Sequence, residues 1–347
     1  MPMKILLVKL SSLGDVVHTL PVVQDILAAL PNAQIDWVVE PAFAPVLSLC
    51  PGLHRVVACD LRRWRKSPLS GTTRREWQAF KVQLQLTAYD AVIDLQGLTK
   101  SALVSWLARL APCGKRYALA NQTDGSGYEA PTRWVADVAI RMLPHSHAVQ
   151  RGRGLAAQAL GYSLASPPDY GLKMPLQRQT RVLCAIENIA NSVAFVHGTS
   201  RADKAWPLAH WVALGQLLNA AGYSVVLAHG NAAELATSEA IARALMPGRT
   251  VSNPAALVLP TLPLDALTPV LAACTGVVGV DSGVSHLAVA LDLPHVQIYN
   301  FDTAWRTGPA SAGASGLRQV SVFAHPAPDV QAVWQAWLKC IAAGAGR

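Results

Sequence analysis

Short apolar runs alternate with longer amphipathic segments in the first half of the chain. The apolar runs predict buried strands at residues 4–10, 34–39, 55–60 and 90–95. Amphipathic patterns between them predict helices at residues 15–30 and 101–110. Because a crossover helix joins one parallel strand to the next, this alternation predicts a parallel sheet with helices on both faces.

The same alternation resumes in the second half, after a break. Residues 163–175 are rich in proline, serine and glycine, and they predict an interdomain linker. Strands are then predicted at 192–197, 224–229, 276–281 and 295–299, with helices at 208–221, 232–245, 285–291 and 327–343. The pattern predicts an α/β protein with two doubly wound domains and a cleft between them. Ligands of such sheets bind outside the carboxyl ends of the strands.

Composition narrows the class of protein. The chain has 347 residues, of which 52% are hydrophobic and 14% charged, so general disorder is excluded. Six scattered cysteines without a C-x-x-C motif argue against a disulfide framework or structural zinc and fit a reducing cytoplasm. No signal peptide or membrane helix is expected, because the apolar runs are short or interrupted by proline.

Positive charge is concentrated in one segment. The chain carries 29 Lys and Arg against 21 Asp and Glu, a net charge of +8. Residues 55–81 hold eight basic and two acidic groups and so supply +6 of it. Such a segment predicts an anionic partner, either nucleic acid, a phosphorylated ligand or an acidic membrane, although a solvated surface segment is the alternative. Arginine suits bidentate capture of phosphate or carboxylate, and Trp64 is available to pack on a sugar, lipid or base.

Three loops that follow predicted strands carry candidate chemistry. After the first strand, Asp15 is either a helix N-terminal acid or a general base facing the cleft, and the segment alone favours the former. Residues 197–207 combine glycine, hydroxyls and Lys204 and favour phosphate over an ordinary loop, although they form no P-loop. Residues 279–286 turn from a strand into a helix, where backbone N–H groups are suited to a diphosphate. His286 is either a ligand contact or a helix-cap partner.

Two missing motifs exclude other classes of site. The sequence contains no D-x-D, so a metal-chelating nucleotide-sugar site of that kind is not indicated. No G-x-G-x-x-G follows a predicted strand, so the fingerprint of a dinucleotide oxidoreductase is missing.

Taken together, these segments resemble glycosyltransferase family 9, the bacterial lipopolysaccharide heptosyltransferases, over nearly the whole chain. The order and spacing of the matching segments carry the resemblance. In chain order they are residues 9–16 with 18–21, 36–40, 62–66, 90–94 with 96–98, 199–207, and 280–283 with 285–287. The Arg-Arg-Trp-Arg-Lys block at 62–66 resembles the members that add the first heptose rather than the second.

The resemblance implies a GT-B fold, with two Rossmann-like domains facing a central cleft. An N-terminal domain, residues 1–165, would bind the Kdo of Kdo–lipid A. A C-terminal domain, residues 176–325, would bind ADP-L-glycero-β-D-manno-heptose. Residues 326–347 would form a C-terminal helix that packs back on the N-terminal domain. The implied reaction is an inverting transfer with no metal or cofactor, on the cytoplasmic face of the inner membrane, where the enzyme would be peripheral. Nucleic acid is not an expected partner.

The resemblance also implies roles for individual residues. Asp15 would be the catalytic base, and Lys204 would offset charge on the ADP leaving group. The implied donor-binding residues are Thr199, Ser200, Lys204, Glu234, Asp281, Ser282, Gly283 and His286. The implied acceptor-binding residues are Ser12, Gly14, Arg62, Arg63, Arg65 and Lys66.

One loop departs from the family, and two other functions stay open. Residues 300–309 lack the family's usual Gly-Pro-Thr-Asp-Pro, so no roles are assigned there. A transferase of the same family for the second heptose or another core sugar is one alternative. A protein that binds RNA or another anionic polymer is the other. The compact basic segment and the near-neutral second half disfavour it.

Overall fold

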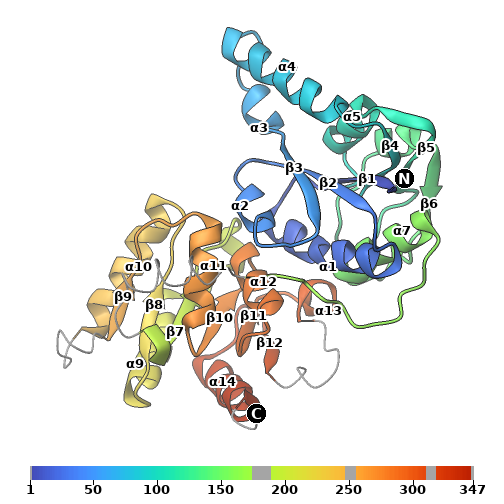
Figure 1. Ribbon diagram of the computed structural model, residues 1–347. Helices are drawn as coiled ribbons and strands as arrows, with labels where there is room; N and C mark the ends of the chain where they lie inside the picture. The colour runs from blue at the N-terminus through green and yellow to red at the C-terminus, as the bar shows by residue number, and fades with distance from the viewer. Residues whose placement is uncertain (1, 174–188, 247–254, 310–317, 345–347) are drawn as a thin grey trace. The chain divides into compact units, whose positions relative to one another are not determined.

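The computed structural model describes residues 2–173, 189–246, 255–309 and 318–344. The chain divides into two compact units, Met1–Lys173 and Met174–Arg347. Each unit is built on one six-stranded parallel sheet with helices packed on it (Figure 1). The predicted pair of doubly wound α/β sheets is therefore confirmed. The expected start of the second domain, residue 176, lies outside the described residues.

The sheet of the first unit is ordered β3-β2-β1-β4-β5-β6. Its strands are β1 (Lys4–Val8), β2 (Gln34–Val39), β3 (Leu53–Ala58), β4 (Tyr89–Asp94), β5 (Leu110–Leu119) and β6 (Val138–Ile140). The central strand β1 pairs with β2 on one side and β4 on the other, and its residues 5–8 are fully buried. The chain leaves β1 toward β2 and later returns to its other side, so the carboxyl end of β1 lies at the topological switch point.

Helices cover both faces of this sheet. They are α1 (Leu13–Ala29), α2 (Ala44–Leu47), α3 (Leu61–Trp64), α4 (Gly71–Gln85), α5 (Thr99–Leu107), α6 (Pro131–Val135) and α7 (Ala148–Leu160). Helix α1 packs against α7, whereas α5 packs against α4 and α6. The right-handed crossover from β1 runs toward β2, and the one from β4 runs in the opposite direction along the sheet. Helices α1 and α7 therefore lie on one face, and α4, α5 and α6 lie on the other.

The second unit repeats the plan in the order β12-β11-β10-β7-β8-β9. Its strands are β7 (Ser192–Val196), β8 (Ser224–Leu227), β9 (Ala256–Val258), β10 (Gly276–Val280), β11 (His295–Tyr299) and β12 (Gln319–Phe323). The helical segments are η1 (Ile189–Asn191), η2 (Ala202–Lys204), α9 (Leu208–Ala220), α10 (Ala232–Leu245), α11 (Leu264–Ala273), α12 (Gly283–Ala290), α13 (Ala304–Thr307) and α14 (Val330–Gly344). The switch point here lies between β7 and β10.

The C-terminal helix α14 belongs to the core of the second unit. It packs against α9, β11 and β12. Trp337 is fully buried in the same cluster as Trp211 and Phe195. A contact between this helix and the N-terminal domain stays a prediction. None of the described helices is long and apolar enough to cross a membrane.

Candidate active site

The first candidate half-site lies where β1 leads into α1. Ser12 is the N-cap of α1, and Asp15 occupies the third helical position. The backbone N–H and the hydroxyl of Ser12 donate to Asp15 Oδ2 over 3.1 and 3.2 Å. Asp15 therefore stabilises the helix terminus, as the structural alternative predicted. Its side chain is still 37% exposed, so it is also open to a substrate.

A buried lysine sets the charge state of Asp15. Lys9 Nζ lies 3.2 Å from Asp15 Oδ1 and donates to the carbonyl oxygen of Leu95 over 3.0 Å. Partial burial raises the pKa of Asp15, but the Lys9 charge and the Ser12 N–H outweigh it and hold this pKa below its usual value. Burial lowers the pKa of Lys9 itself. Asp15 is thus a carboxylate at neutral pH. Lys9 was not among the candidates, because a strand-end lysine alone does not identify its partner.

The end of β4 clamps the loop that carries Asp15. Gln96 Oε1 accepts the backbone N–H groups of Leu10 and Ser11 over 3.0 and 3.1 Å. Asp94 is almost fully buried and accepts N–H groups from Gln96 and Gly97. Burial raises the pKa of Asp94 to about 6. The loop geometry is therefore fixed by hydrogen bonds from a neighbouring strand.

Two further ionic side chains complete this edge of the sheet. Lys100, from the first turn of α5, donates to Ser11 Oγ over 2.5 Å and to Glu40 Oε1 over 3.1 Å. Glu40 follows β2 and is 7% exposed. The carboxyl ends of β1, β2 and β4 thus bring together Lys9, Asp15, Lys100 and Glu40. Sequence reasoning missed Lys100 and Glu40 as site residues, because their meeting depends on the strand order.

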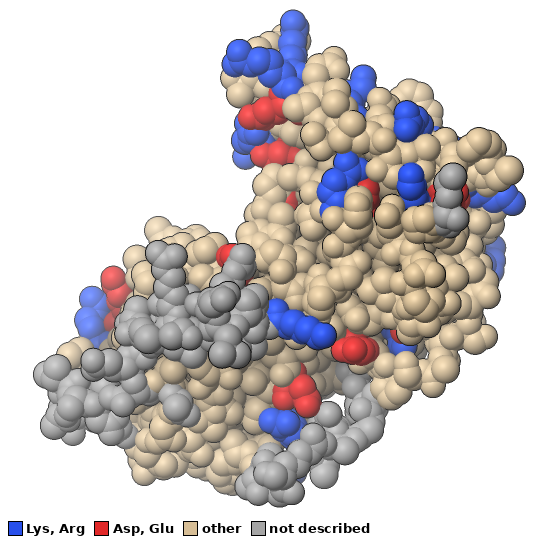
Figure 2. Space-filling model, in the orientation of Figure 1, with Lys and Arg blue, Asp and Glu red and all other residues tan. Residues whose placement is uncertain are grey.

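The basic segment is less available to a ligand than its charge suggested. Arg55 pairs with buried Asp36 over 2.7 Å. Arg63 Nε donates to Asp60 Oδ2 over 2.6 Å, and Arg63 also pairs with Glu76. These two guanidinium groups neutralise the unit's own acids. Lys and Arg gather over α3 and the N-terminal end of α4, with acidic groups beside them (Figure 2).

Within the predicted acceptor block, exposure differs from residue to residue. Arg62 is 65% exposed and lies 3.8 Å from Glu40, while Arg65 and Lys66 are exposed. Trp64 offers little free surface for the ligand packing that the sequence suggested. Trp64 is 7% exposed, and its indole N–H donates to Glu76 Oε2 over 2.7 Å. An apolar ring cluster with Trp77 and Phe80 buries it.

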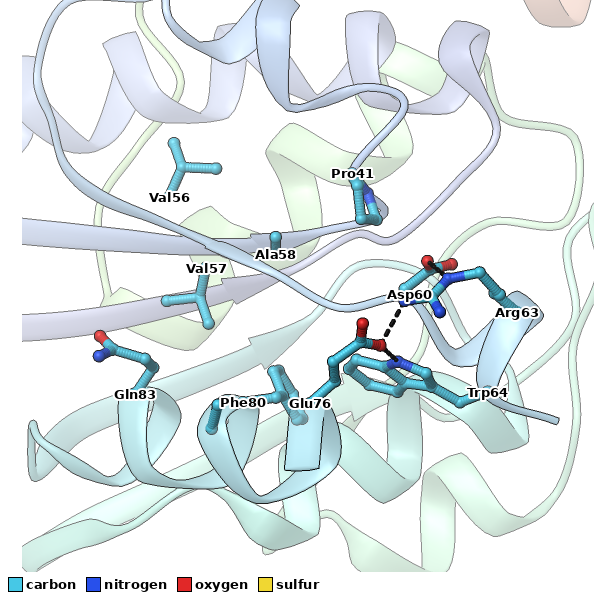
Figure 3. Close-up of a pocket in the computed structure, with 11 residues that line it drawn as sticks. Pro41, Val56, Val57, Ala58, Asp60, Arg63, Trp64, Glu76, Phe80 and Gln83 are labelled. Atoms are coloured by element: carbon cyan, nitrogen blue, oxygen red, sulfur yellow. Dashed lines mark hydrogen bonds and ion pairs between the residues drawn. The ribbon is translucent and has the colours of Figure 1, made fainter. Parts of the chain in front are cut away.

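A cavity of about 330 Å³ opens beside this cluster (Figure 3). Residues of β3, α3 and α4 line it, and the bonded group of Asp60, Arg63, Glu76 and Trp64 stands at one end. Away from this group, Val56, Val57 and Ala58 line the cavity together with Gln83. Arg63 and its two acids are thus part of the wall of a pocket rather than an isolated patch of positive charge.

The second half-site is centred on Asp281, which follows β10. Lys204 Nζ lies 2.5 Å from Asp281 Oδ2, and His286 Nε2 lies 3.4 Å from Oδ1. Asp281 is 6% exposed, which raises its pKa, but His286 and Lys204 hold the pKa well below its usual range. Ser282 is the N-cap of α12, and Gly283 is its first residue. The carboxyl ends of β7 and β10 therefore hold together a cation, a carboxylate, an imidazole and a helix N-terminus without a side-chain cap.

The atypical loop at 300–309 is tied to this half-site. Asn300 Nδ2 donates to the carbonyl oxygens of Asp203 and Ala205, both over 3.0 Å, on either side of Lys204. Thr307 Oγ1 lies 3.5 Å from Asp281 Oδ1. No roles were predicted here, because the loop lacks the family's motif. Asn300 nevertheless holds the backbone on either side of Lys204, and Thr307 contacts the Asp281 carboxylate.

Other predicted donor residues lie around the end of β7. Thr199 Oγ1 accepts the backbone N–H of Arg201 over 3.4 Å, and Ser200 is exposed. Glu234, in the first turn of α10, accepts the N–H of Gly230 over 2.7 Å. A Cβ on Gly198 would lie 2.5 Å from the Glu234 carboxyl carbon, so glycine lets the Glu234 side chain keep this position. Glu234 therefore packs directly on the loop that holds Thr199 and Ser200.

Comparisons with known proteins identify the family of the chain. The model of glycosyltransferase family 9 (heptosyltransferase) matches residues 77–332. Lipopolysaccharide heptosyltransferase 1 of Pseudomonas aeruginosa is 39% identical over 319 residues, which are 92% of this chain and 83% of that protein. The structure of E. coli heptosyltransferase WaaC with ADP matches with a TM-score of 0.80 and 33% identity, over 96% of this chain and 98% of that one. WaaC with ADP-2-deoxy-2-fluoro heptose matches over the same shares with a TM-score of 0.77 and 34% identity. The chain therefore belongs to glycosyltransferase family 9, the heptosyltransferases.

Proposed function

We propose that this enzyme transfers L-glycero-D-manno-heptose from ADP-heptose to the Kdo of Kdo–lipid A, with inversion at the anomeric carbon. The observation that carries the proposal is the ionised, partly exposed Asp15 at the carboxyl end of β1, with Lys9 beside it. The relative at 39% identity is a heptosyltransferase 1, which favours this acceptor over that of a second-heptose or other core-sugar transferase. Membership of a glycosyltransferase family counts against an RNA-binding function.

Asp15 would act as the general base. The Kdo hydroxyl oxygen attacks C1 of the heptose on the face opposite the diphosphate, and its proton passes to the Asp15 carboxylate. The bond from C1 to the phosphate oxygen breaks, and ADP leaves with that electron pair. A carboxylate with a lowered pKa is a weak base, so it accepts the proton only as the attacking oxygen becomes acidic. Because Lys9 stabilises the carboxylate, nearly every enzyme molecule holds Asp15 in the ionised form that can accept a proton.

The Asp281 half-site would hold the donor. A diphosphate can accept hydrogen bonds from the free N–H groups at the start of α12 and from the hydroxyls of Thr199 and Ser200. Lys204 is 21% exposed and already faces the Asp281 carboxylate. In the donor complex it would offer its remaining N–H groups to the phosphate and stabilise the ADP leaving group. Glu234 would accept hydrogen bonds from the nucleotide ribose.

The first unit would hold the acceptor. Ser12 is exposed beside Asp15 and would line the sugar, whereas Gly14 is buried in the first turn of α1 and would act only through the backbone there. The exposed cations Arg62, Arg65 and Lys66 would face the carboxylates and phosphates of the headgroup. Arg63 would orient the block through its two acids rather than bind as a free cation. We further propose that the enzyme works in the cytoplasm, as a peripheral protein of the inner membrane.

A donor screen tests the proposed function. The purified chain is incubated with Kdo–lipid A and, in separate reactions, with ADP-heptose, a UDP-sugar and a GDP-sugar. We expect transfer from ADP-heptose alone, with one heptose added per acceptor, as measured by mass spectrometry. Transfer only to an acceptor that already carries a heptose would instead make the chain a second-heptose enzyme.

A further inference from the structure

Asn300, the first residue after β11, connects that strand end to the loop that holds Lys204. In the sheet, β10 lies between β11 and β7 (Figure 1). The backbone N–H of Asp281, just after β10, donates to the carbonyl oxygen of Ile298 in β11 over 3.1 Å. The loop with Lys204 follows β7, on the other side of β10. The Asn300 side chain therefore joins the ends of two strands that are not neighbours in the sheet.

The Asn300 amide bridges the backbone on either side of Lys204. Its Nδ2 donates to the carbonyl oxygens of Asp203 and Ala205, over 3.0 Å each. The backbone bonds of the short turn η2 are accepted by earlier carbonyl oxygens of the loop. Because a turn of three residues is held only weakly by its own bonds, the two bonds from Asn300 fix the backbone from which Lys204 projects.

The Asn300 side chain is closed to substrate. The residue is 6% exposed, and its Nδ2 is committed to the two carbonyl oxygens. Its Oδ1 is buried and has no hydrogen-bond partner among the residues that the structure describes. A buried acceptor without a partner is unfavourable, so the two N–H bonds must offset that cost. An amide in this setting influences a reaction only through the groups that it holds.

Lys204 is fixed at both ends. Its Nζ lies 2.5 Å from Asp281 Oδ2, and its side chain is 21% exposed. Lysine has a flexible stem, so its ammonium group keeps one position only where both its backbone and its partner are fixed. Strand β10 fixes Asp281, and Asn300 fixes the backbone of the loop. A cation placed in advance stabilises a leaving group better than a mobile one, because it need not reorganise during the reaction.

We propose that Asn300 is a positioning residue for Lys204, which holds the loop so that the ammonium group faces the diphosphate of the donor. This inference rests on the proposed function for the identity of that ligand. It assigns a role within the loop at 300–309, where the family's usual motif is missing. Because the Asn300 side chain is closed to substrate, its loss should weaken contacts with the phosphates and spare contacts with the nucleoside.

Binding of ADP and of adenosine tests this separation. Asn300→Leu removes both N–H donors, keeps a similar size and adds no charge. We expect ADP to bind about tenfold more weakly, because the ammonium group is no longer held toward the phosphates. Adenosine, which has no phosphate, should keep its affinity. Calorimetric titration measures the affinity of ADP, and ligand-observed NMR titration measures that of adenosine.

Asn219→Leu is the matched control. Asn219 Nδ2 also donates to two carbonyl oxygens, those of Tyr223 and Ala255, over 3.1 and 3.0 Å. These two residues precede β8 and β9, so they lie at the opposite edge of the same sheet from Lys204. The control variant should bind ADP and adenosine like the unchanged chain.

Acylation of lysines in the unliganded chain tests the positioning without any nucleotide. An ammonium group that spends less time against Asp281 is more open to acetic anhydride. In Asn300→Leu, the acylation rate of Lys204 should rise about fivefold, as measured for each peptide by mass spectrometry. The rate at Lys339, which is exposed on α14, should not change. Asn300→Ala carries the same expectations if circular dichroism shows that the leucine variant does not fold.

The two measurements separate this proposal from the proposed function. If the unchanged chain binds no ADP, the proposed function fails, and the acylation rates still decide whether Asn300 positions Lys204. An acylation rate of Lys204 that neither Asn300 variant changes would overturn the proposal. So would equal weakening of ADP and adenosine, because a general disturbance of the second unit would then be the cause rather than a misplaced ammonium group.

Discussion

At the scale of single residues, two carboxylates compete for the role of base, and their surroundings separate them. Asp281 is 6% exposed and is held by Lys204 and His286. Asp15 has one buried cationic partner and a side chain that is 37% exposed. Only Asp15 combines an ionised state with room for a sugar hydroxyl. Asp281 is better suited to positioning Lys204 and His286.

Lys9→Met should move the acidic limb of the kcat profile to higher pH. The Lys9 charge helps to hold the pKa of Asp15 below its ordinary value, so its removal raises that pKa. The base is then protonated, and inactive, at a higher pH than before. We expect a shift on the order of one pH unit, measured from kcat between acidic and neutral pH.

Lys100→Met is the matched control for that measurement. Lys100 lies on the same edge of the sheet, but it donates to Ser11 and Glu40 rather than to Asp15. Its removal should move the acidic limb much less than removal of Lys9. Equal shifts in the two variants would show that the loss of any nearby positive charge moves the acidic limb of the kcat profile, and that the Lys9–Asp15 ion pair has no special effect on it.

At the scale of secondary-structure elements, the sequence predicted the strands that position the site. Strands β2 and β11 and helix α10 have the predicted bounds, since each is a clear apolar or amphipathic run. Strand β5 was missed because Pro112 and Gly114 interrupt its pattern, and β6 and β9 because they have three residues each. Strand β12, at the edge of the second sheet, was missed as well. Local pattern therefore finds the central strands more readily than those toward the edge.

The candidate site was predictable as a set of strand ends but not as a set of contacts. Doubly wound sheets place their ligands at the carboxyl ends of strands, which marked the loops that hold Asp15, Lys204 and Asp281, whereas the roles of these residues came from the resemblance to the family. The pairing of Lys204 with Asp281 spans 77 residues of sequence. In the sequence, Arg63 and Trp64 stand out only as part of a local run of basic residues. In the structure both side chains bond to Glu76, which lies on the next helix. Such partners depend on packing, which one sequence does not reveal.

Gly198→Ala should weaken ADP binding about tenfold while the fold is kept. The added methyl group would lie 2.5 Å from the Glu234 carboxyl carbon, so the Glu234 side chain must turn away and give up its bond to the N–H of Gly230. The displaced carboxylate would no longer be placed to accept hydrogen bonds from the nucleotide ribose. Calorimetric titration with ADP measures the change.

Gly230→Ala provides the comparison for that variant. A Cβ at Gly230 would meet the same Glu234 carboxylate at 3.5 Å, which is ordinary van der Waals contact. ADP affinity should therefore stay close to that of the unchanged chain. If both variants bind ADP normally, Glu234 and the loop after β7 do not form part of the donor site.

At the scale of the whole molecule, the two units differ in charge. Residues 1–173 carry 19 Lys and Arg against 12 Asp and Glu, whereas the second unit is nearly neutral. The proposed division of substrates follows this difference. An anionic lipid acceptor suits the basic first unit, and a nucleotide sugar can be held by helix N–H groups and Lys204 in the second.

The central claim of the proposed function is that the Asp15 carboxylate accepts the proton of the attacking acceptor hydroxyl. Asp15→Asn keeps the size of the side chain and removes its basicity, so donor binding should be unchanged. The most direct test measures ADP-heptose affinity by calorimetry and heptose transfer in a single turnover on the same preparation of this variant. We expect a normal dissociation constant and a transfer rate lowered by roughly a hundredfold to ten-thousandfold. Transfer near the rate of the unchanged chain would contradict the assignment of Asp15 as the base.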